Sequence, residues 1–134
     1  MSTEFTNLEE IYTKVIIKGY LKNITDNKTD NFEVKGIKNK NKISYITDNI
    51  KYNIKIINKN KLLFQRENND FKHSFIFDNN KTTISNYLIL ENELDLEIEV
   101  KVLSLIINDN LIKINYLVPD SNIEFEYKLE MSDK

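Results

Sequence analysis

The sequence has no cysteine, no tryptophan and no alanine, and its 134 residues include only two glycines, one proline and one arginine. Without cysteine, neither disulfides nor thiolate chemistry can occur. With glycine only at positions 19 and 36, no glycine-rich phosphate loop can form. No stretch approaches the roughly 18 apolar residues of a membrane helix. The polar, acidic start MSTEFTNLEE also lacks the apolar segment of a signal peptide. We therefore expect a cytoplasmic protein.

The abundant residue types carry little functional information. Asn, Lys and Ile have A/T-rich codons, whereas the rare Ala, Gly and Pro have G/C-rich codons, so a low-GC genome accounts for the bias. Asn is then expected at turns where Gly is usual. The net charge of −2 gives no attraction to nucleic acid or anionic lipid, and we expect neither as a partner.

Apolar and polar residues alternate with a period of two along most of the chain. Ile123, Phe125 and Tyr127 alternate with glutamates, which predicts a strand with one buried and one wet side. Clusters of Asn, Asp, Lys and Ser recur about every ten residues, as is typical of a meander, sandwich or barrel. We expect ten strands, at residues 13–23, 32–38, 42–47, 50–57, 61–66, 71–77, 83–90, 93–107, 111–118 and 122–131.

Plausible pairings within two hairpins support a sequential order of strands. Pairing of Val118 with Ile123 places the apolar residues of both strands on one side. Pairing of Arg66 with Phe71 likewise places the apolar residues of the strands at 61–66 and 71–77 on one side, together with His73.

Two local features depart from simple alternation. In the strand at 93–107, even positions are apolar through Val102, and then Leu103 and Leu105 become apolar, which predicts a bulge near Leu103–Ser104. Near the N-terminus, Thr6 and Glu9 have the spacing of a capping box, which predicts a short helix at 7–11.

Ten sequential strands with one wet face fit either a sandwich or a barrel. The near-continuous hairpin order favours an antiparallel up-and-down β-barrel of about 8–10 strands. Closure would also protect long apolar strands from edge-to-edge association. No repeat or linker is visible, so we expect residues 1–134 to form one all-β domain.

Several segments occur in an order that resembles the YwiB-like family, small uncharacterised bacterial proteins with a lipocalin-like (calycin) barrel. The segments are Phe32–Gly36, Ile43–Ile46, Tyr52–Ile56, Leu62–Arg66, Tyr87–Leu90, Glu93–Leu96, Ile112–Tyr116 and Ile123–Tyr127. The family usually has a glycine where this chain has Glu67–Asn69, and another near Asn92. Because Asn tolerates left-handed backbone, we expect both turns to survive. The resemblance implies a cytoplasmic barrel of eight or so strands and no known activity.

Arg66 and His73 are the most conspicuous candidates for a binding site. Arg66 is the only arginine beside eighteen lysines, and by alternation it shares the predicted interior face with Phe64. An inward arginine can hold a carboxylate or phosphate bidentately, as in fatty-acid-binding barrels. The alternative is a head group in solvent or on Glu67. His73, the only histidine, is better interpreted as a hydrogen-bonded core residue, because a lone histidine cannot form a zinc site without carboxylate ligands and no spacing suggests them.

Tyr116 and Tyr127 also fall on the predicted interior face, where their hydroxyl groups could either surround a cavity or reach the barrel rim. The acidic row from Glu93 to Glu99 alternates with apolar residues and is expected on the solvated outside. No catalytic residue, metal ligand or cofactor is predicted. The candidate ligand-binding residues are Arg66, His73, Tyr116, Tyr127 and Phe64.

The sequence therefore predicts a binding module for a small apolar or acidic-headed ligand. It does not predict an enzyme, because no nucleophile, base and metal set is recognisable by spacing. The alternative is a structural or protein-interaction domain with a filled barrel. In that case, apolar residues out of phase with their strands could cover a homodimer interface or pack under the N-terminal segment. These residues are Ile16, Leu63, Ile76, Leu103 and Leu105.

Overall fold

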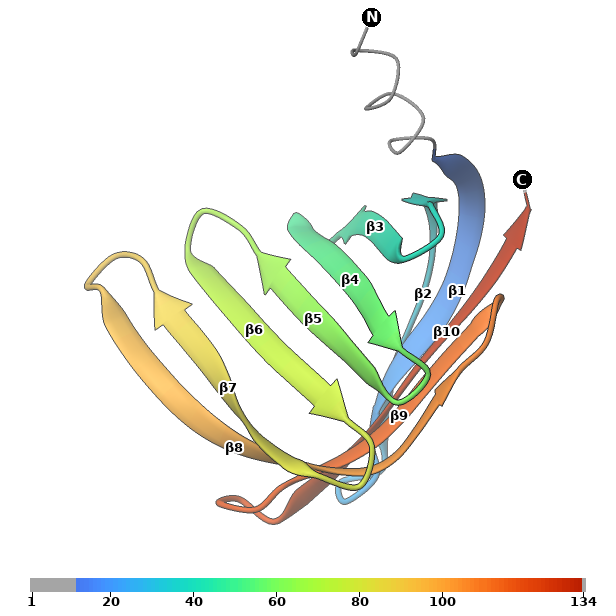
Figure 1. The fold of residues 1–134 in the computed structure, drawn as a ribbon. Helices are drawn as coiled ribbons and strands as arrows, with labels where there is room; N and C mark the ends of the chain where they lie inside the picture. The colour runs from blue at the N-terminus through green and yellow to red at the C-terminus, as the bar shows by residue number, and fades with distance from the viewer. Residues whose placement is uncertain (1–11, 134) are drawn as a thin grey trace, which may run out of the picture.

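The computed structural model describes residues 12–133, which form ten antiparallel strands in one closed barrel (Figure 1). Each strand pairs with the next along the chain, and β10 closes the barrel on β1. No helix within this range is long and apolar enough to cross a membrane. The strands are β1 (Thr13–Asn23), β2 (Lys28–Lys38), β3 (Lys42–Thr47), β4 (Ile50–Asn58), β5 (Lys61–Glu67), β6 (Phe71–Asp78), β7 (Thr82–Ile89), β8 (Leu94–Ile107), β9 (Leu111–Val118) and β10 (Ile123–Asp133).

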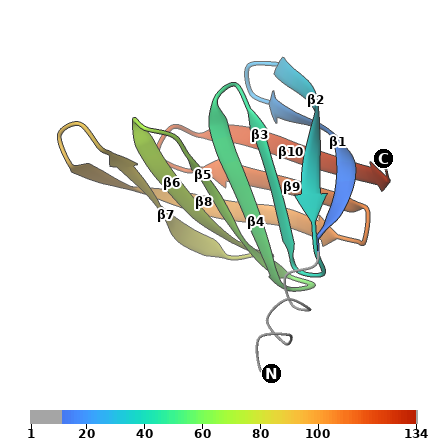
Figure 2. The same cartoon turned by 90° about the horizontal axis from the view of Figure 1, so that it is seen from above.

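The all-β, up-and-down barrel predicted from alternation is confirmed. Every predicted strand is present, and only the start of β2 differs by more than two residues, at Lys28 rather than 32. Figure 2 shows β3–β6 crossing over β8–β10 of the opposite wall, as expected when strands tilt to close a barrel. The short helix predicted at 7–11 lies outside the described residues.

Asparagine and aspartate take the left-handed backbone that glycine usually supplies at turns. The two-residue turn between β3 and β4 has positive φ at both Asp48 (52°) and Asn49 (61°), as a type I′ turn requires. Asn27, Asn80 and Asn122 also have positive φ. Substitution of Asn for Gly therefore preserves the short turns of this barrel.

The two turns where the family usually has glycine are built differently from the prediction. After β5, no residue of Glu67–Asn69 is left-handed; instead, Asn68 Oδ1 accepts hydrogen bonds from the backbone N–H groups of Asp70 (2.8 Å) and Phe71 (3.3 Å). In the β7–β8 turn, the left-handed residue is Glu93, while Asn92 Oδ1 accepts from a backbone N–H. Both turns are present without glycine, and in each one an asparagine side chain accepts hydrogen bonds from the backbone of the turn.

One of the two predicted registers is confirmed and the other is wrong by two residues. Val118 pairs with Ile123, as predicted. In the β5–β6 hairpin, however, Arg66 pairs with His73 and not with Phe71. Glu67 pairs with Lys72, so the four-residue loop that Asn68 opens lies one residue later in the chain than the predicted loop Glu67–Asp70. A shift of two residues keeps every side chain on its face, and here it makes Arg66 and His73 direct neighbours.

The predicted bulge in β8 is confirmed by a register shift between Val102 and Ser104. The shift turns Leu105 into the core, where it is 6% exposed, while Leu103 stays outside. The expectation that Leu105 belongs to an exposed apolar set is therefore wrong, because the bulge reverses the inward and outward parity after it.

Aliphatic side chains fill the end of the barrel where β1 begins and β10 ends. Fully buried residues there include Ile17, Ile43, Leu62, Ile112 and Leu129. The turns β1–β2, β3–β4, β5–β6, β7–β8 and β9–β10 surround the opposite end. The two ends of the barrel thus differ in how completely side chains fill them.

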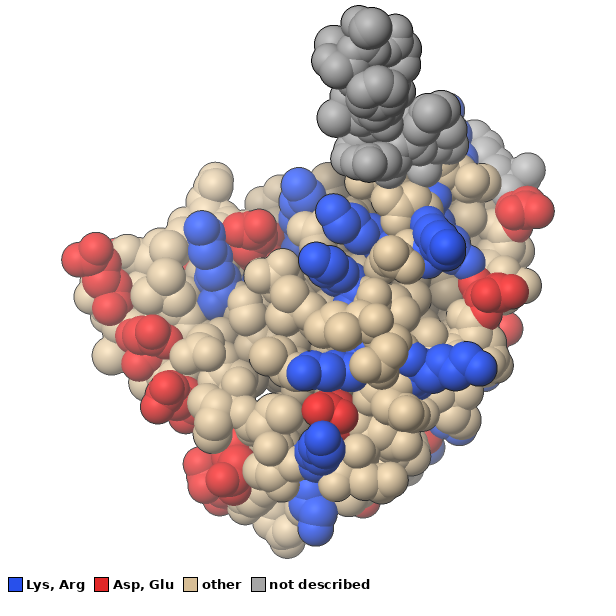
Figure 3. Space-filling view, in the orientation of Figure 1, with Lys and Arg blue, Asp and Glu red and all other residues tan. Residues whose placement is uncertain are grey.

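The β7–β8 hairpin projects beyond the rest of the rim, at the left of Figure 1. β8 starts to pair with β9 only at Lys101, so its first residues pair with β7 alone. Leu94 and Leu96, predicted on the buried side of this strand, are therefore 45% and 41% exposed. On the other side, the acidic row from Glu93 to Glu99 is exposed as expected, and acidic side chains gather along this edge in Figure 3.

Candidate functional site

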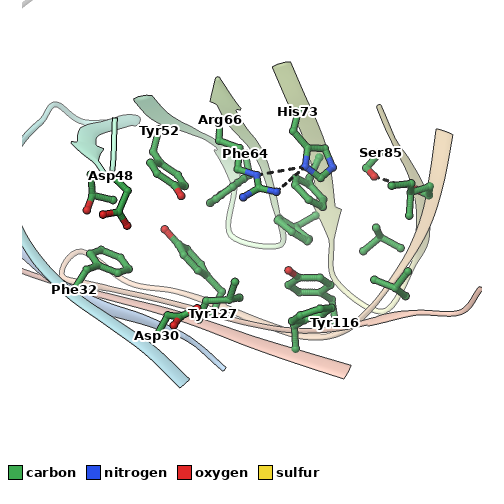
Figure 4. A pocket seen from close by; sticks show the side chains of 18 of the residues that line it. Asp30, Phe32, Asp48, Tyr52, Phe64, Arg66, His73, Ser85, Tyr116 and Tyr127 are labelled. Atoms are coloured by element: carbon green, nitrogen blue, oxygen red, sulfur yellow. Dashed lines mark hydrogen bonds between the residues drawn. The ribbon is translucent and has the colours of Figure 1, made fainter. Parts of the chain in front are cut away.

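A cavity of about 720 Å³ occupies the end of the barrel that the aliphatic core leaves open (Figure 4). All ten strands contribute to its lining, and polar residues of β2, the β3–β4 hairpin and the β9–β10 turn lie at its mouth. Its volume falls within the range of small-molecule sites, roughly 300–1,000 Å³. The barrel therefore has room for one small ligand.

The five residues that the sequence singles out all line this cavity: Arg66, His73, Phe64, Tyr116 and Tyr127. Tyr45 and Tyr52 line it too. They belong to the seven tyrosines whose hydroxyl groups could surround a cavity, but they were not among the five predicted candidates. The alternation of inward and outward side chains could have identified Tyr52, because it lies two residues from the buried Ile54 and therefore on the same face of the strand. The structure brings the predicted residues together; their role in binding stays a prediction.

Arg66 and His73 form a hydrogen-bonded pair on adjacent strands. Arg66 Nε and a terminal guanidinium nitrogen each lie 3.3 Å from His73 Nδ1. A guanidinium can only donate, so Nδ1 accepts and the imidazole hydrogen is on Nε2. The guanidinium also lies 5.4 Å from the ring centroid of Phe71. No ion pair among residues 12–133 includes Arg66, so the alternative placement on Glu67 is wrong. The side chain is half-buried, so it lines the cavity and keeps contact with solvent, as the other alternative allows.

His73 is held in the neutral form. Burial within the barrel, and then the adjacent charge of Arg66, lower its pKa from 6.5 to about 4. The side chain is only 6% exposed, and its Nε2 is a buried donor without a partner among the described residues. The predicted core histidine is therefore hydrogen-bonded on one nitrogen only.

The interior tyrosines keep their hydroxyl groups inside the barrel. The hydroxyls of Tyr45 and Tyr127 hydrogen-bond to each other across the cavity. The Tyr116 hydroxyl is directed toward the side of the cavity with Arg66 and His73 (Figure 4), and it has no hydrogen bond to the protein within residues 12–133. The alternative that Tyr116 and Tyr127 reach the rim is therefore wrong.

Burial keeps these phenols protonated. It raises the pKa of Tyr116 to about 12, although the Arg66 charge opposes the shift. It also raises the pKa of Tyr127 well above the usual value of 10. Each hydroxyl is therefore a neutral group that can donate a hydrogen bond as well as accept one.

Aromatic rings form the floor of the cavity. Phe64 of β5 meets Tyr127 of β10 edge to face at 5.1 Å between centroids, and Phe77 of β6 lies 5.1 Å from Tyr116 of β9. Both contacts reach across the barrel, and Phe75 stacks on Phe77 at 5.1 Å. The cavity thus ends on rings held in place by other rings.

The charges in the cavity lie on two different sides. Asp30 and Asp48 are exposed at the mouth, on β2 and the β3–β4 turn. Figure 4 shows them on one side of the cavity, and Arg66 and His73 farther along it. Within the described range, no three residues of the metal-binding types cluster closely enough to hold an ion. The Arg66 guanidinium is the positive centre of the site.

The fold and this site define a class: a closed, ten-stranded up-and-down barrel whose interior is filled at one end and hollow at the other. The sequence matches no protein-family model and no curated protein. The structure is similar to the crystal structure of the YwiB protein from Bacillus subtilis, with a TM-score of 0.69 and 18% sequence identity over 92% of this chain and 93% of that one. At that identity the likeness establishes the fold alone, and it confirms the YwiB-like β-barrel that the sequence predicts.

Proposed function

We propose that this barrel is a binding module that encloses one small ligand, with the apolar part of the ligand against the aromatic wall and an acidic head at Arg66. The observation that carries the proposal is a guanidinium in a cavity without a carboxylate partner. Arg66 is half-buried, it lines the cavity, and among residues 12–133 its polar partner is His73 and not a carboxylate. An anionic ligand would supply a partner of opposite charge.

We propose binding rather than catalysis because the one histidine is unsuited to general base chemistry. Its Nδ1 lone pair is already used by Arg66, and its lowered pKa makes it a weak base near neutral pH. The remaining polar groups of the wall are suited to holding a ligand in one orientation.

Native mass spectrometry of the protein purified from its own host tests this proposal. We expect a single bound small molecule on the wild-type protein and its loss after denaturation and refolding. The Arg66→Gln variant should carry little of it. Lys72→Gln is the matched control, since it removes a positive charge from an exposed position on the adjacent strand. A bare wild-type mass, or equal occupancy in Arg66→Gln, would contradict the proposal.

A second role, self-association, is favoured by an apolar row on the outside of the barrel. Leu63 of β5 pairs with Ile76 of β6, and Ile76 and Ile84 are 39% and 48% exposed. We propose this row as a dimer interface that is compatible with ligand binding. Sedimentation analysis should then give a dimeric mass for the wild type and a monomeric mass for Ile76→Lys; a wild-type monomer at high concentration would exclude it.

A further inference from the structure

We infer that the ligand is a planar aromatic carboxylate with hydrogen-bonding substituents on its ring system. Its carboxylate would bind Arg66, and its ring would pack between the aromatic side chains of the cavity. This inference rests on the proposed binding function and names the chemical class of the ligand.

The composition of the wall favours a ring over an aliphatic chain. Five phenylalanines and four tyrosines line the cavity, against four aliphatic side chains, Leu21, Ile98, Val100 and Val118. Aromatic pairs gain stabilisation beyond the area they bury when rings stack or meet edge to face. The wall already shows both geometries, with Tyr45 and Tyr52 stacked at 4.7 Å and Phe64 and Phe75 edge to face at 5.7 Å. A planar ligand can continue this pattern.

Polar groups spread over the same wall favour substituents on the ring. The hydroxyl groups of Tyr52 and Tyr116 have no hydrogen-bond partner in the described part of the chain. A plain hydrocarbon ligand would expel water from these groups and leave them unpaired, which costs about 1–3 kcal/mol per buried group. A ligand with hydroxyl or carbonyl groups would satisfy them. The arrangement therefore discriminates against a fatty acid.

Donors exceed acceptors on the side of the cavity that carries Arg66. Of the five guanidinium N–H donors, at most two point at His73 Nδ1, so at least three are free for a ligand. His73 Nε2 is enclosed by protein atoms, so the donors that a ligand can reach on this side belong to the guanidinium. Two carboxylate oxygens fit the planar fork of a guanidinium bidentately. Asp30 and Asp48 would repel an anion on their side of the mouth and so favour the side that carries Arg66.

Isothermal titration calorimetry with four probes tests the inference: naphthoate, a hydroxynaphthoate, decanoate and naphthol. We expect naphthoate to bind at least about tenfold more tightly than decanoate, and the hydroxynaphthoate several-fold more tightly again. Arg66→Gln should weaken binding of both aromatic acids by at least about tenfold and leave naphthol unchanged. Lys72→Gln should change neither the affinity for the aromatic acids nor the affinity for naphthol.

Tyr116→Phe should remove the advantage of the hydroxynaphthoate over naphthoate, since it deletes the hydroxyl that recognises the substituent. Circular dichroism verifies the fold of each variant, and Tyr52→Phe replaces Tyr116→Phe if the latter does not fold. Decanoate binding as tightly as the aromatic acids would overturn the inference and leave the proposed function standing. Equal affinity of the two aromatic acids would overturn the requirement for substituents. No binding of any probe, together with a bare native mass, would overturn the proposed function itself.

Discussion

The ionisation of His73 gives the sharpest test of the geometry of the site, because the chain has one histidine and its signal is unambiguous. In the folded protein, burial and the Arg66 charge lower the pKa of His73 to about 4, whereas the unfolded chain keeps a value near 6.5. Between these values the unfolded chain binds a proton that the folded protein does not. The free energy of unfolding must therefore fall as the pH is lowered through this range.

The size of this effect follows from the two pKa values. The stabilisation due to neutral His73 is fully present above the unfolded pKa of 6.5 and is lost progressively toward pH 4. Linkage gives a loss of about 1.4 kcal/mol between pH 7.5 and pH 5.5, and of about 2.5 kcal/mol by pH 4.5. Such a loss is a large part of the stability of an ordinary domain.

Urea denaturation at the three pH values, for the wild type and for His73→Gln, measures the effect. Glutamine can still accept from Arg66 but does not titrate, so the difference between the two proteins isolates His73 from the carboxylates. A nuclear magnetic resonance titration of the imidazole gives its pKa directly, and Arg66→Gln should raise it by removing the neighbouring cation. A wild-type imidazole pKa near 6.5, or the same pH dependence in His73→Gln, would refute the reasoning.

Three further predictions concern the barrel itself. Ile114→Ala, at a fully buried position, should lower the free energy of unfolding by about 2–5 kcal/mol in urea denaturation, because it leaves a cavity in the filled end. Gly19→Ala should destabilise the protein or prevent its expression in soluble form, since the added Cβ would lie 2.5 Å from the carbonyl oxygen of Lys128; unchanged thermal stability would contradict the close approach. Tyr45→Phe and Tyr127→Phe should each cost about 1 kcal/mol, and the double variant should cost less than their sum, because both remove one shared hydrogen bond.

Strand positions and fold class could be predicted because they depend on local pattern. In β10, the alternation of apolar residues with glutamate and lysine fixes which side faces inward, and Val118 and Ile123 pair as the short turn predicts. The β5–β6 register could not be fixed in the same way, since a shift of two residues preserves the pattern. There, the observed register is accompanied by a hydrogen bond from the backbone N–H of Asp70 to the side chain of Asn68, which closes the turn.

The site was partly predictable for the same reason. Parity places Arg66, His73 and Tyr116 on the interior face, and the structure agrees. Alternation shows which side of a strand faces inward, but it does not show how far along the barrel axis that side is covered by other strands. Leu94 and Leu96 were therefore expected inside, and they are exposed at the rim. Alternation also does not identify the partner of an individual side chain, so the hydrogen bond between Tyr45 and Tyr127 could not be predicted.

A hollow interior by itself follows from strand number. A barrel of about eight strands is just wide enough for its own side chains to fill, so ten strands leave space unless large residues span the interior. Here rings meet across the barrel at Phe64 and Tyr127, and beyond them the interior is open. Strand number does not explain why the one arginine among nineteen basic residues lies in that space. The half-buried guanidinium lines the cavity without a carboxylate partner among residues 12–133, and an acidic ligand would give it one.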